Sequence, residues 1–203
     1  MNARIEKYLK AYNLVQFVGW LLALLILPVN FILSFYIIYG VQLLSLLEIF
    51  HAYRKWTHSS PLFCFLQIGA RLMILYFVLA LSIKFFIPIH HLFFTNDKVE
   101  TIAHIMFIAW CTAEIIRYAY YLTELYQMKH DGLLWLRYTA FIICYPVGLI
   151  CELYILTNVF VATPLLLLKI LIILIFTGYA IAFPRLYLHL LKQRKQKLSF
   201  SKY

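Results

Sequence analysis

Residues 136–158 read LRYTAFIICYPVGLICELYILTN, and this stretch decides the class of fold. Most of its side chains are apolar, and about 20 apolar residues in a helix span the ~30 Å hydrocarbon core of a bilayer. Four of its residues are nevertheless poor choices for a lipid-facing helix, namely Tyr145, Pro146, Gly148 and Glu152. The stretch therefore predicts a membrane-spanning helix that also carries polar groups and two residues that disturb helical geometry.

The composition of the whole chain indicates the same class of fold. The chain has 203 residues, of which 65% are hydrophobic and only 13% are charged, with a mean hydropathy of +0.85. A soluble domain carries about 25% charged residues. Six apolar segments follow one another along the chain, at residues 14–27, 31–52, 61–87, 102–126, 136–158 and 165–186. We therefore expect an all-α integral membrane protein, a six-transmembrane-helix bundle that forms a single domain over residues 1–203.

The first apolar segment is short, and the turn PVN at residues 28–30 that follows it is very tight. Two helices that each cross the bilayer are one interpretation of this region. A re-entrant feature formed by the segments on either side of the turn is the other. The sequence leaves both open at this position.

Positive charge lies at the ends of the apolar segments. The net charge is +10, and the densest basic run is KQRKQKLSFSKY at residues 192–203. Loops rich in lysine and arginine stay on the cytosolic side of a membrane, so we expect cytosolic termini and a basic cytosolic tail over about residues 187–203. The tail would face anionic lipid, with attraction of an anionic soluble substrate as the second interpretation. The N-terminal residues resemble a cytosolic lead-in rather than a signal peptide, and we expect no nucleic-acid partner.

The cysteines give no sign of a disulfide or a metal site. All four lie inside apolar segments, and their spacing is not that of zinc ligands. They are Cys64, Cys111, Cys144 and Cys151. We therefore expect neither a disulfide nor a bound metal.

Ionisable residues inside the predicted spans are few, and such residues usually face the interior of a bundle. One group could neutralise itself in a structural ion-pair network, namely Glu48, Arg71, Glu114 and Arg117. Gln67 and Arg71 are four residues apart, so they share a helix face. Arg137 stands at the start of the fifth segment, where an anchoring role at the membrane interface is the alternative to a binding role.

Tyr145 and Glu152 are harder to explain by structure alone. Seven residues turn a helix by about 700° and advance it by ~10.5 Å, so the two side chains lie on one stripe. Gly148 falls between them and leaves a groove, while Pro146 disturbs the helix beside it. Helix packing would account for the glycine and the tyrosine but would leave Glu152 without a visible partner. A carboxyl group in a dry site is suited to general acid or base chemistry, which we expect here.

Six motifs in order along the chain carry a resemblance to a known family. They are YLKAYN with GW (8–13, 19–20), VQLLSLLEIFHA (41–52), SSP with LQIGARL (59–61, 66–72), AEIIRYAYY (113–121), LRYTAFIICYPVGLICEL (136–153) and FPRLYLHLLKQRKQKL (183–198). The chain resembles the very-long-chain 3-hydroxyacyl-CoA dehydratase family, once called protein-tyrosine-phosphatase-like membrane proteins. It departs from the family in short connections after the first and fifth spans and in a tryptophan displaced to Trp110.

The older phosphatase name finds no support around Cys144 in the fifth segment. A Cys-x5-Arg phosphatase needs an arginine six residues after its cysteine to hold phosphate. The residue six positions after Cys144 is Ile150. We therefore expect no phosphatase activity.

The resemblance implies a six-span protein of the endoplasmic reticulum membrane. Such a protein removes water from 3-hydroxyacyl-CoA to give trans-2-enoyl-CoA, the third step of the fatty-acid elongation cycle. The family's Tyr-Pro-x-Gly-x-x-x-Glu pattern falls on residues 145–152, which implies that Tyr145 and Glu152 are the catalytic pair. The implied partners are the acyl-CoA substrate, the lipid bilayer and the other elongation enzymes, namely the condensing enzyme, the ketoreductase and the enoyl reductase. No cofactor is expected, since CoA is part of the substrate.

On this mechanism Glu152 acts as the acid and base, and Tyr145 hydrogen-bonds to the thioester carbonyl or to the leaving hydroxyl. Further residues are expected to bind the substrate, namely Arg117, Tyr118, Tyr121, Arg71, Gln67, Gly148 and Arg137. The alternative function is a non-catalytic membrane scaffold or a small-molecule transporter, which would also explain charges inside the spans. A transporter would favour internal repeats, and the sequence has none of the kind that marks many transporters.

Overall fold

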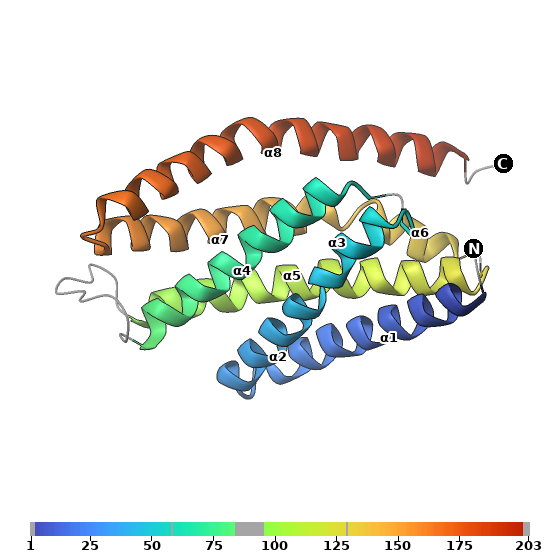
Figure 1. Cartoon of the computed structure of the whole chain (residues 1–203), viewed down its shortest axis with the longest axis horizontal. Coiled ribbons are helices and arrows are strands. Elements are labelled where there is room, and N and C mark those ends of the chain that lie inside the picture. The colour runs from blue at the N-terminus through green and yellow to red at the C-terminus, as the bar shows by residue number, and fades with distance from the viewer. Residues whose placement is uncertain (1–2, 58, 84–95, 129, 201–203) are drawn as a thin grey trace. The chain divides into compact units, whose positions relative to one another are not determined.

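The computed structural model describes residues 3–57, 59–83, 96–128 and 130–200, and these ranges contain helices and no strand (Figure 1). The helices are α1 (Ala3–Ile26), α2 (Phe31–Leu44), α3 (Leu46–Tyr53), α4 (Pro61–Ile83), α5 (Asn96–Leu125), α6 (Asp131–Arg137), α7 (Phe141–Ala162) and α8 (Leu166–Phe200). The chain divides into two compact units, which are described separately below. Unit 1 comprises residues 1–76 and 110–129, and unit 2 comprises residues 77–109 and 130–203.

Within the described ranges, six helical stretches are long and apolar enough to cross a membrane. Two of these stretches contain a short interruption, so that α2 with α3 and α6 with α7 each make one span. The other four spans are formed by α1, α4, α5 and α8. The prediction of an all-α, six-span membrane protein is therefore confirmed, whereas the single-domain organisation stays a prediction.

The first span is longer than its apolar segment indicates. Helix α1 begins at Ala3 rather than near residue 14, because its early charged and polar residues are good helix formers even though they lower the hydropathy. The turn after it is as tight as expected, and the Asn30 side chain caps α2 by accepting from the Leu33 N–H at 2.9 Å. Helix α1 and the stretch formed by α2 and α3 are each long and apolar enough to cross a membrane, which favours two crossing spans over the re-entrant interpretation.

The last span also extends beyond its apolar segment. Helix α8 continues through the basic run to Phe200, because lysine, glutamine, arginine and leucine are all strong helix formers. Pro184, which stands two residues before the end of the last apolar segment, consequently lies inside a helix. The basic residues of the tail up to Lys197 are thus carried on a helix rather than on an extended segment.

Helices α1 and α2 form a closely packed antiparallel pair within unit 1 (Figure 1). The Gln16 side chain, fully buried in this interface, donates to the Tyr12 hydroxyl at 3.0 Å and to the Ser45 hydroxyl at 3.1 Å. Gly19 lets the two backbones approach, since a Cβ atom there would lie 2.4 Å from Cγ1 of Val41. Small residues commonly permit such close contacts between membrane helices.

Replacement of Gly19 by alanine is expected to destabilise this pair by about 1–3 kcal/mol, because the added methyl group overpacks the contact with Val41. The measurement is unfolding of the purified protein in detergent micelles. Gly40→Ala is the matched control, since a Cβ atom at Gly40 meets nothing within 4 Å. Val41→Ala should restore stability to the Gly19→Ala variant. Equal stability of the Gly19→Ala and Gly40→Ala variants would contradict the close contact.

Candidate active site

The predicted catalytic stripe lies on α7 in unit 2. Tyr145, Gly148 and Glu152 all belong to this helix, so Tyr145 and Glu152 remain on one side of it, seven residues apart. Gly148 is buried, and the tyrosine and the glutamate are half-buried. The opposite side is open, with 70% of Ile143 and 65% of Ile150 exposed. The stripe therefore runs along the side of α7 that meets protein, and the open side is suited to lipid.

Glu152 has a partner that the sequence did not reveal. Its Oε2 atom accepts a hydrogen bond from the Tyr179 hydroxyl of α8 at 2.7 Å. The expectation that helix packing would leave this glutamate without a visible partner is therefore wrong. Tyr179 was missed because it stands in an apolar helix with no neighbouring charge to mark it, in the run FTGYAIAF at residues 176–183.

Tyr145 has an aromatic neighbour one helical turn away. Its ring centroid lies 6.0 Å from that of Phe141, with the rings at 60°. Among the residues that the structure describes, no hydrogen-bond partner occupies its hydroxyl. The ring is thus held by packing, while the hydroxyl is able to bind another molecule.

Pro146 has a structural consequence that involves α8. Proline has no N–H to donate to the carbonyl four residues earlier, which is that of Ile142. The Tyr187 hydroxyl of α8 lies 3.3 Å from this oxygen and donates to it. The break that Pro146 makes in the hydrogen-bonding of α7 is therefore compensated by a side chain of the neighbouring helix.

The hydrogen bonds of Tyr179 and Tyr187 connect α8 to α7, and they define the register of the two helices. Tyr179 contacts Glu152, and Tyr187, eight residues later on α8, contacts Ile142, ten residues earlier on α7. The helices are therefore antiparallel (Figure 1). Tyr145 and Gly148 fall between the levels of the two tyrosine contacts. A third bond, from Arg194 Nε to the Thr139 hydroxyl at 3.3 Å, joins α8 to the turn that precedes α7.

Arg137 is the last residue of α6, at the turn before α7. Its side chain is half-buried, and it lies in the same unit as the catalytic stripe. The structure does not choose between its anchoring role and its binding role, and the latter stays a prediction.

The other predicted binding residues belong to unit 1, where Arg71 and Arg117 form an ion-pair network with Glu48 and Glu114. Arg71 Nη1 lies 2.5 Å from Glu114, and Arg117 bridges Glu114 at 2.7 Å and Glu48 at 2.9 Å. Glu114 is only 2% exposed. The predicted ion-pair network of these four residues is therefore present, since each carboxylate lies against an oppositely charged group, while the roles of Arg71 and Arg117 in substrate binding stay predictions.

Aromatic hydroxyls complete this network. The fully buried Tyr118 donates a short hydrogen bond to Glu48, and Tyr12 donates to the same carboxylate at 3.3 Å. The ring of Tyr121 lies 6.0 Å from the Arg117 guanidinium group. Tyr12 was missed by the sequence reasoning, because it lies in a part of α1 that was not included in the apolar segment.

Gln67 and Arg71 share a face of α4, as predicted from their spacing, but their surroundings differ. The Gln67 side chain is exposed, whereas Arg71 is largely buried, and its guanidinium carbon lies 5.0 Å from the Trp110 ring centroid. The substrate-binding roles of these residues stay predictions.

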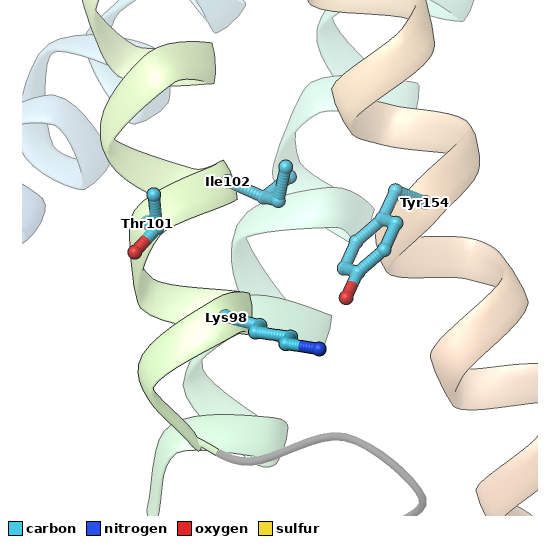
Figure 2. Close-up of a pocket in the computed structure, with 4 residues that line it drawn as sticks. All are labelled: Lys98, Thr101, Ile102 and Tyr154. Atoms are coloured by element: carbon cyan, nitrogen blue, oxygen red, sulfur yellow. The ribbon is translucent and has the colours of Figure 1, made fainter.

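A cavity of about 250 Å³ occurs in unit 2, but it does not lie on the catalytic stripe. It is lined by Lys98, Thr101, Ile102 and Tyr154 (Figure 2). Tyr154 follows Glu152 by two residues and therefore points about 200° around α7 from it. The cavity and the glutamate thus belong to opposite sides of the helix.

The described part of the chain holds no group of three or more His, Cys, Asp or Glu side chains that could bind a metal ion. The four cysteines are free thiols, of which Cys111 and Cys151 are buried.

Comparison with known proteins identifies relatives of this chain. Residues 42–200 match the family described as protein tyrosine phosphatase-like protein, PTPLA. Very-long-chain (3R)-3-hydroxyacyl-CoA dehydratase 3 of Pongo abelii is 31% identical over 71% of this chain, and the match covers 40% of that protein. The probable very-long-chain (3R)-3-hydroxyacyl-CoA dehydratase of Schizosaccharomyces pombe is 33% identical over 70% of this chain and 68% of its own length. Very-long-chain (3R)-3-hydroxyacyl-CoA dehydratase 2 of Mus musculus is 29% identical over 95% of this chain and 81% of its own.

The matches differ in how much of each relative they cover. The chain spans only 40% of the length of the dehydratase 3 relatives. No solved structure matches it. The family match nevertheless covers most of the sequence and includes the whole of α7 and α8. The resemblance predicted from the motifs is therefore confirmed, and the chain belongs to the protein tyrosine phosphatase-like, PTPLA, family.

Proposed function

We propose that this protein dehydrates very-long-chain 3-hydroxyacyl-CoA to trans-2-enoyl-CoA, as a carbon–oxygen lyase of the fatty-acid elongation cycle. One observation carries the proposal: a tyrosine and a glutamate lie seven residues apart on one stripe of a membrane-spanning helix. Relatives that bear the dehydratase name support the substrate class. The Cys-x5-Arg spacing of phosphatases does not occur at Cys144 but does occur at Cys111 and Arg117. Cys111 is fully buried, and Arg117 is paired with Glu48 and Glu114, so this spacing does not support a phosphatase function.

The chemistry needs one base and one acid, and a single carboxyl group can serve as both. The Glu152 carboxylate removes a proton from the α-carbon, and negative charge develops on the thioester oxygen. The β-carbon–oxygen bond then breaks as the same carboxyl group returns the proton to the leaving hydroxyl, so that water departs and a carbon–carbon double bond forms. Tyr145 donates a hydrogen bond to the thioester oxygen or to the leaving hydroxyl. A bond to the thioester oxygen would stabilise its developing negative charge, as an oxyanion hole does. The reaction balances without a cofactor.

The charge at one end of the α7–α8 pair suits the CoA group. Arg137 precedes α7, and Arg194 lies against Thr139 in the turn between α6 and α7. Counted from the first residue of α7, Tyr145 lies about 6 Å and Glu152 about 16 Å further along the helix. A CoA head bound near the two arginines would place the acyl chain along the stripe, toward the apolar end of α8.

The setting that fits this function is the endoplasmic reticulum membrane, with both termini in the cytosol. The cations at the chain ends support the orientation. The partners would be the acyl-CoA substrate and the other elongation enzymes, namely the condensing enzyme, the ketoreductase and the enoyl reductase. Such partners would supply the 3-hydroxyacyl-CoA and consume the enoyl product.

The direct test is turnover by the purified protein in detergent or in lipid vesicles. Long-chain 3-hydroxyacyl-CoA is added, and trans-2-enoyl-CoA is measured by mass spectrometry and by the ultraviolet absorbance of its conjugated thioester. Saturable formation of the enoyl product is expected. If correctly folded protein binds the substrate but forms no product, the scaffold alternative is favoured and the dehydration is refuted.

A further inference from the structure

We propose that Tyr179 is a positioning residue for Glu152, which its hydroxyl holds in the orientation that dehydration requires. The inference rests on the proposed function, because that function gives Glu152 a proton to transfer. It adds a residue from the sixth span to a catalytic pair that the sequence placed on the fifth span.

The geometry of the contact is that of a strong hydrogen bond. The Tyr179 hydroxyl lies 2.7 Å from Glu152 Oε2, the usual length for an O–H···O bond. Both side chains are half-buried, and each comes from a regular helix. The second tyrosine contact, between Tyr187 and the Ile142 carbonyl, fastens the same two helices at another level. Groups on packed helices are held more accurately than groups on loops.

Thr177 and Tyr179 lie close together on α8, but the first forms its hydrogen bond within α8 and the second forms its hydrogen bond with α7. The Thr177 hydroxyl bonds to the Ile173 carbonyl of its own helix at 2.9 Å. A phenol is too long to do the same, and in an apolar setting an unpaired hydroxyl is costly. Tyr179 reaches across to α7 and bonds to Glu152. The bond therefore ties the orientation of the carboxyl group to the register between α7 and α8.

A fixed orientation matters because the last torsion of a glutamate side chain is broad and sets where each oxygen points. A base must present a lone pair toward the α-hydrogen of the substrate within hydrogen-bonding reach. A carboxylate has about four acceptor sites on its two oxygens. A hydrogen bond at Oε2 thus restricts rotation of the group and leaves it able to accept a proton.

The test begins with the Tyr179→Phe variant, which keeps the ring and removes only the hydroxyl. We expect kcat for 3-hydroxyacyl-CoA to fall by about 10- to 100-fold with KM nearly unchanged, the usual effect of losing one hydrogen bond to a charged group. Tyr154→Phe is the matched control. It removes a hydroxyl from the same region of α7, on the side facing away from Glu152, and should stay within about twofold of wild type.

A double variant separates positioning from mere stabilisation. If Tyr179 acts through Glu152, adding Tyr179→Phe to Glu152→Gln should change the residual turnover by less than about twofold. A general structural role would instead lower the residual turnover by the same factor as in the wild-type background. Such multiplication of the two effects overturns the proposal.

Infrared spectroscopy gives a readout that does not depend on turnover. The carboxyl band of Glu152 is assigned by its loss in Glu152→Gln, and it should shift in Tyr179→Phe but not in Tyr154→Phe. An unshifted band in Tyr179→Phe overturns the proposal. If the wild type turns over normally and the effects of Tyr179→Phe and Glu152→Gln on turnover multiply, the positioning role of Tyr179 is overturned while the dehydration stands. Absence of wild-type turnover, even with a shifted band, refutes the dehydration and the positioning role with it.

Discussion

Glu152→Gln is expected to lower the turnover of 3-hydroxyacyl-CoA by about 10³-fold, the largest effect on activity of any single change in this chain. Glutamine has the size of glutamate and can still accept the Tyr179 hydrogen bond through its amide oxygen. It cannot take a proton from carbon, and general acid–base groups typically contribute about 10²- to 10⁴-fold. The measurement is enoyl-CoA formation at saturating substrate, with folding checked by the unfolding midpoint in detergent.

Tyr145→Phe should lower kcat less, by about 10²-fold, because it removes one hydrogen bond to developing charge and leaves the acid and base in place. The two replacements together should cost far less than the product of their separate effects, since both residues serve one step. Tyr36→Phe, at an exposed tyrosine of α2, is the control for loss of a phenol hydroxyl. Turnover within tenfold of wild type in Glu152→Gln would exclude this glutamate as the acid and base.

The number of spans was predictable because hydropathy measures what a bilayer requires of a helix. The ends of α1 and α8 were not, since helix propensity and not hydropathy decides where a helix stops outside the bilayer. The charged start of α1 at Ala3 and the basic end of α8 at Phe200 are therefore helical, although neither is apolar. Breaks such as those at Ser45 and before Phe141 also have no signal in hydropathy.

The shared side of Tyr145, Gly148 and Glu152 was predictable for a different reason. These residues lie on one helix, and the period of 3.6 residues per turn fixes which side chains share a side. Contacts between helices have no such rule, because they depend on the register at which two helices pack. Tyr179 and Tyr187 could therefore not be matched to Glu152 and Ile142 from the sequence. The one available signal was Pro146, because a proline within a helix leaves the carbonyl four residues earlier, here that of Ile142, without its helical hydrogen-bond donor.

Glu114→Gln is expected to destabilise the protein by about 3–5 kcal/mol, the largest effect on stability of a single change outside α7. The Glu114 carboxylate is almost fully buried between Arg71 and Arg117, at 2.5 Å and 2.7 Å. Removal of one partner from a buried ion pair leaves charge that the interior cannot solvate. The shift is measured as the unfolding midpoint in detergent micelles.

Glu124→Gln is the matched control, because Glu124 lies on the same helix, is exposed and accepts a hydrogen bond only from Tyr120 among the described contacts. Its replacement should change stability by less than about 0.5 kcal/mol. Addition of Arg71→Met to Glu114→Gln should recover part of the loss, with a coupling of about 0.5–3 kcal/mol, because it removes one of the two stranded cations. If the double variant is as unstable as the sum of the single changes, Arg71 and Glu114 do not act as a pair. Arg71 belongs to α4, Glu48 to α3, and Glu114 and Arg117 to α5. A measured coupling between Arg71 and Glu114 would therefore mean that these charges hold helices of unit 1 together. The polar groups within the spans would then divide into a structural network and a chemical stripe.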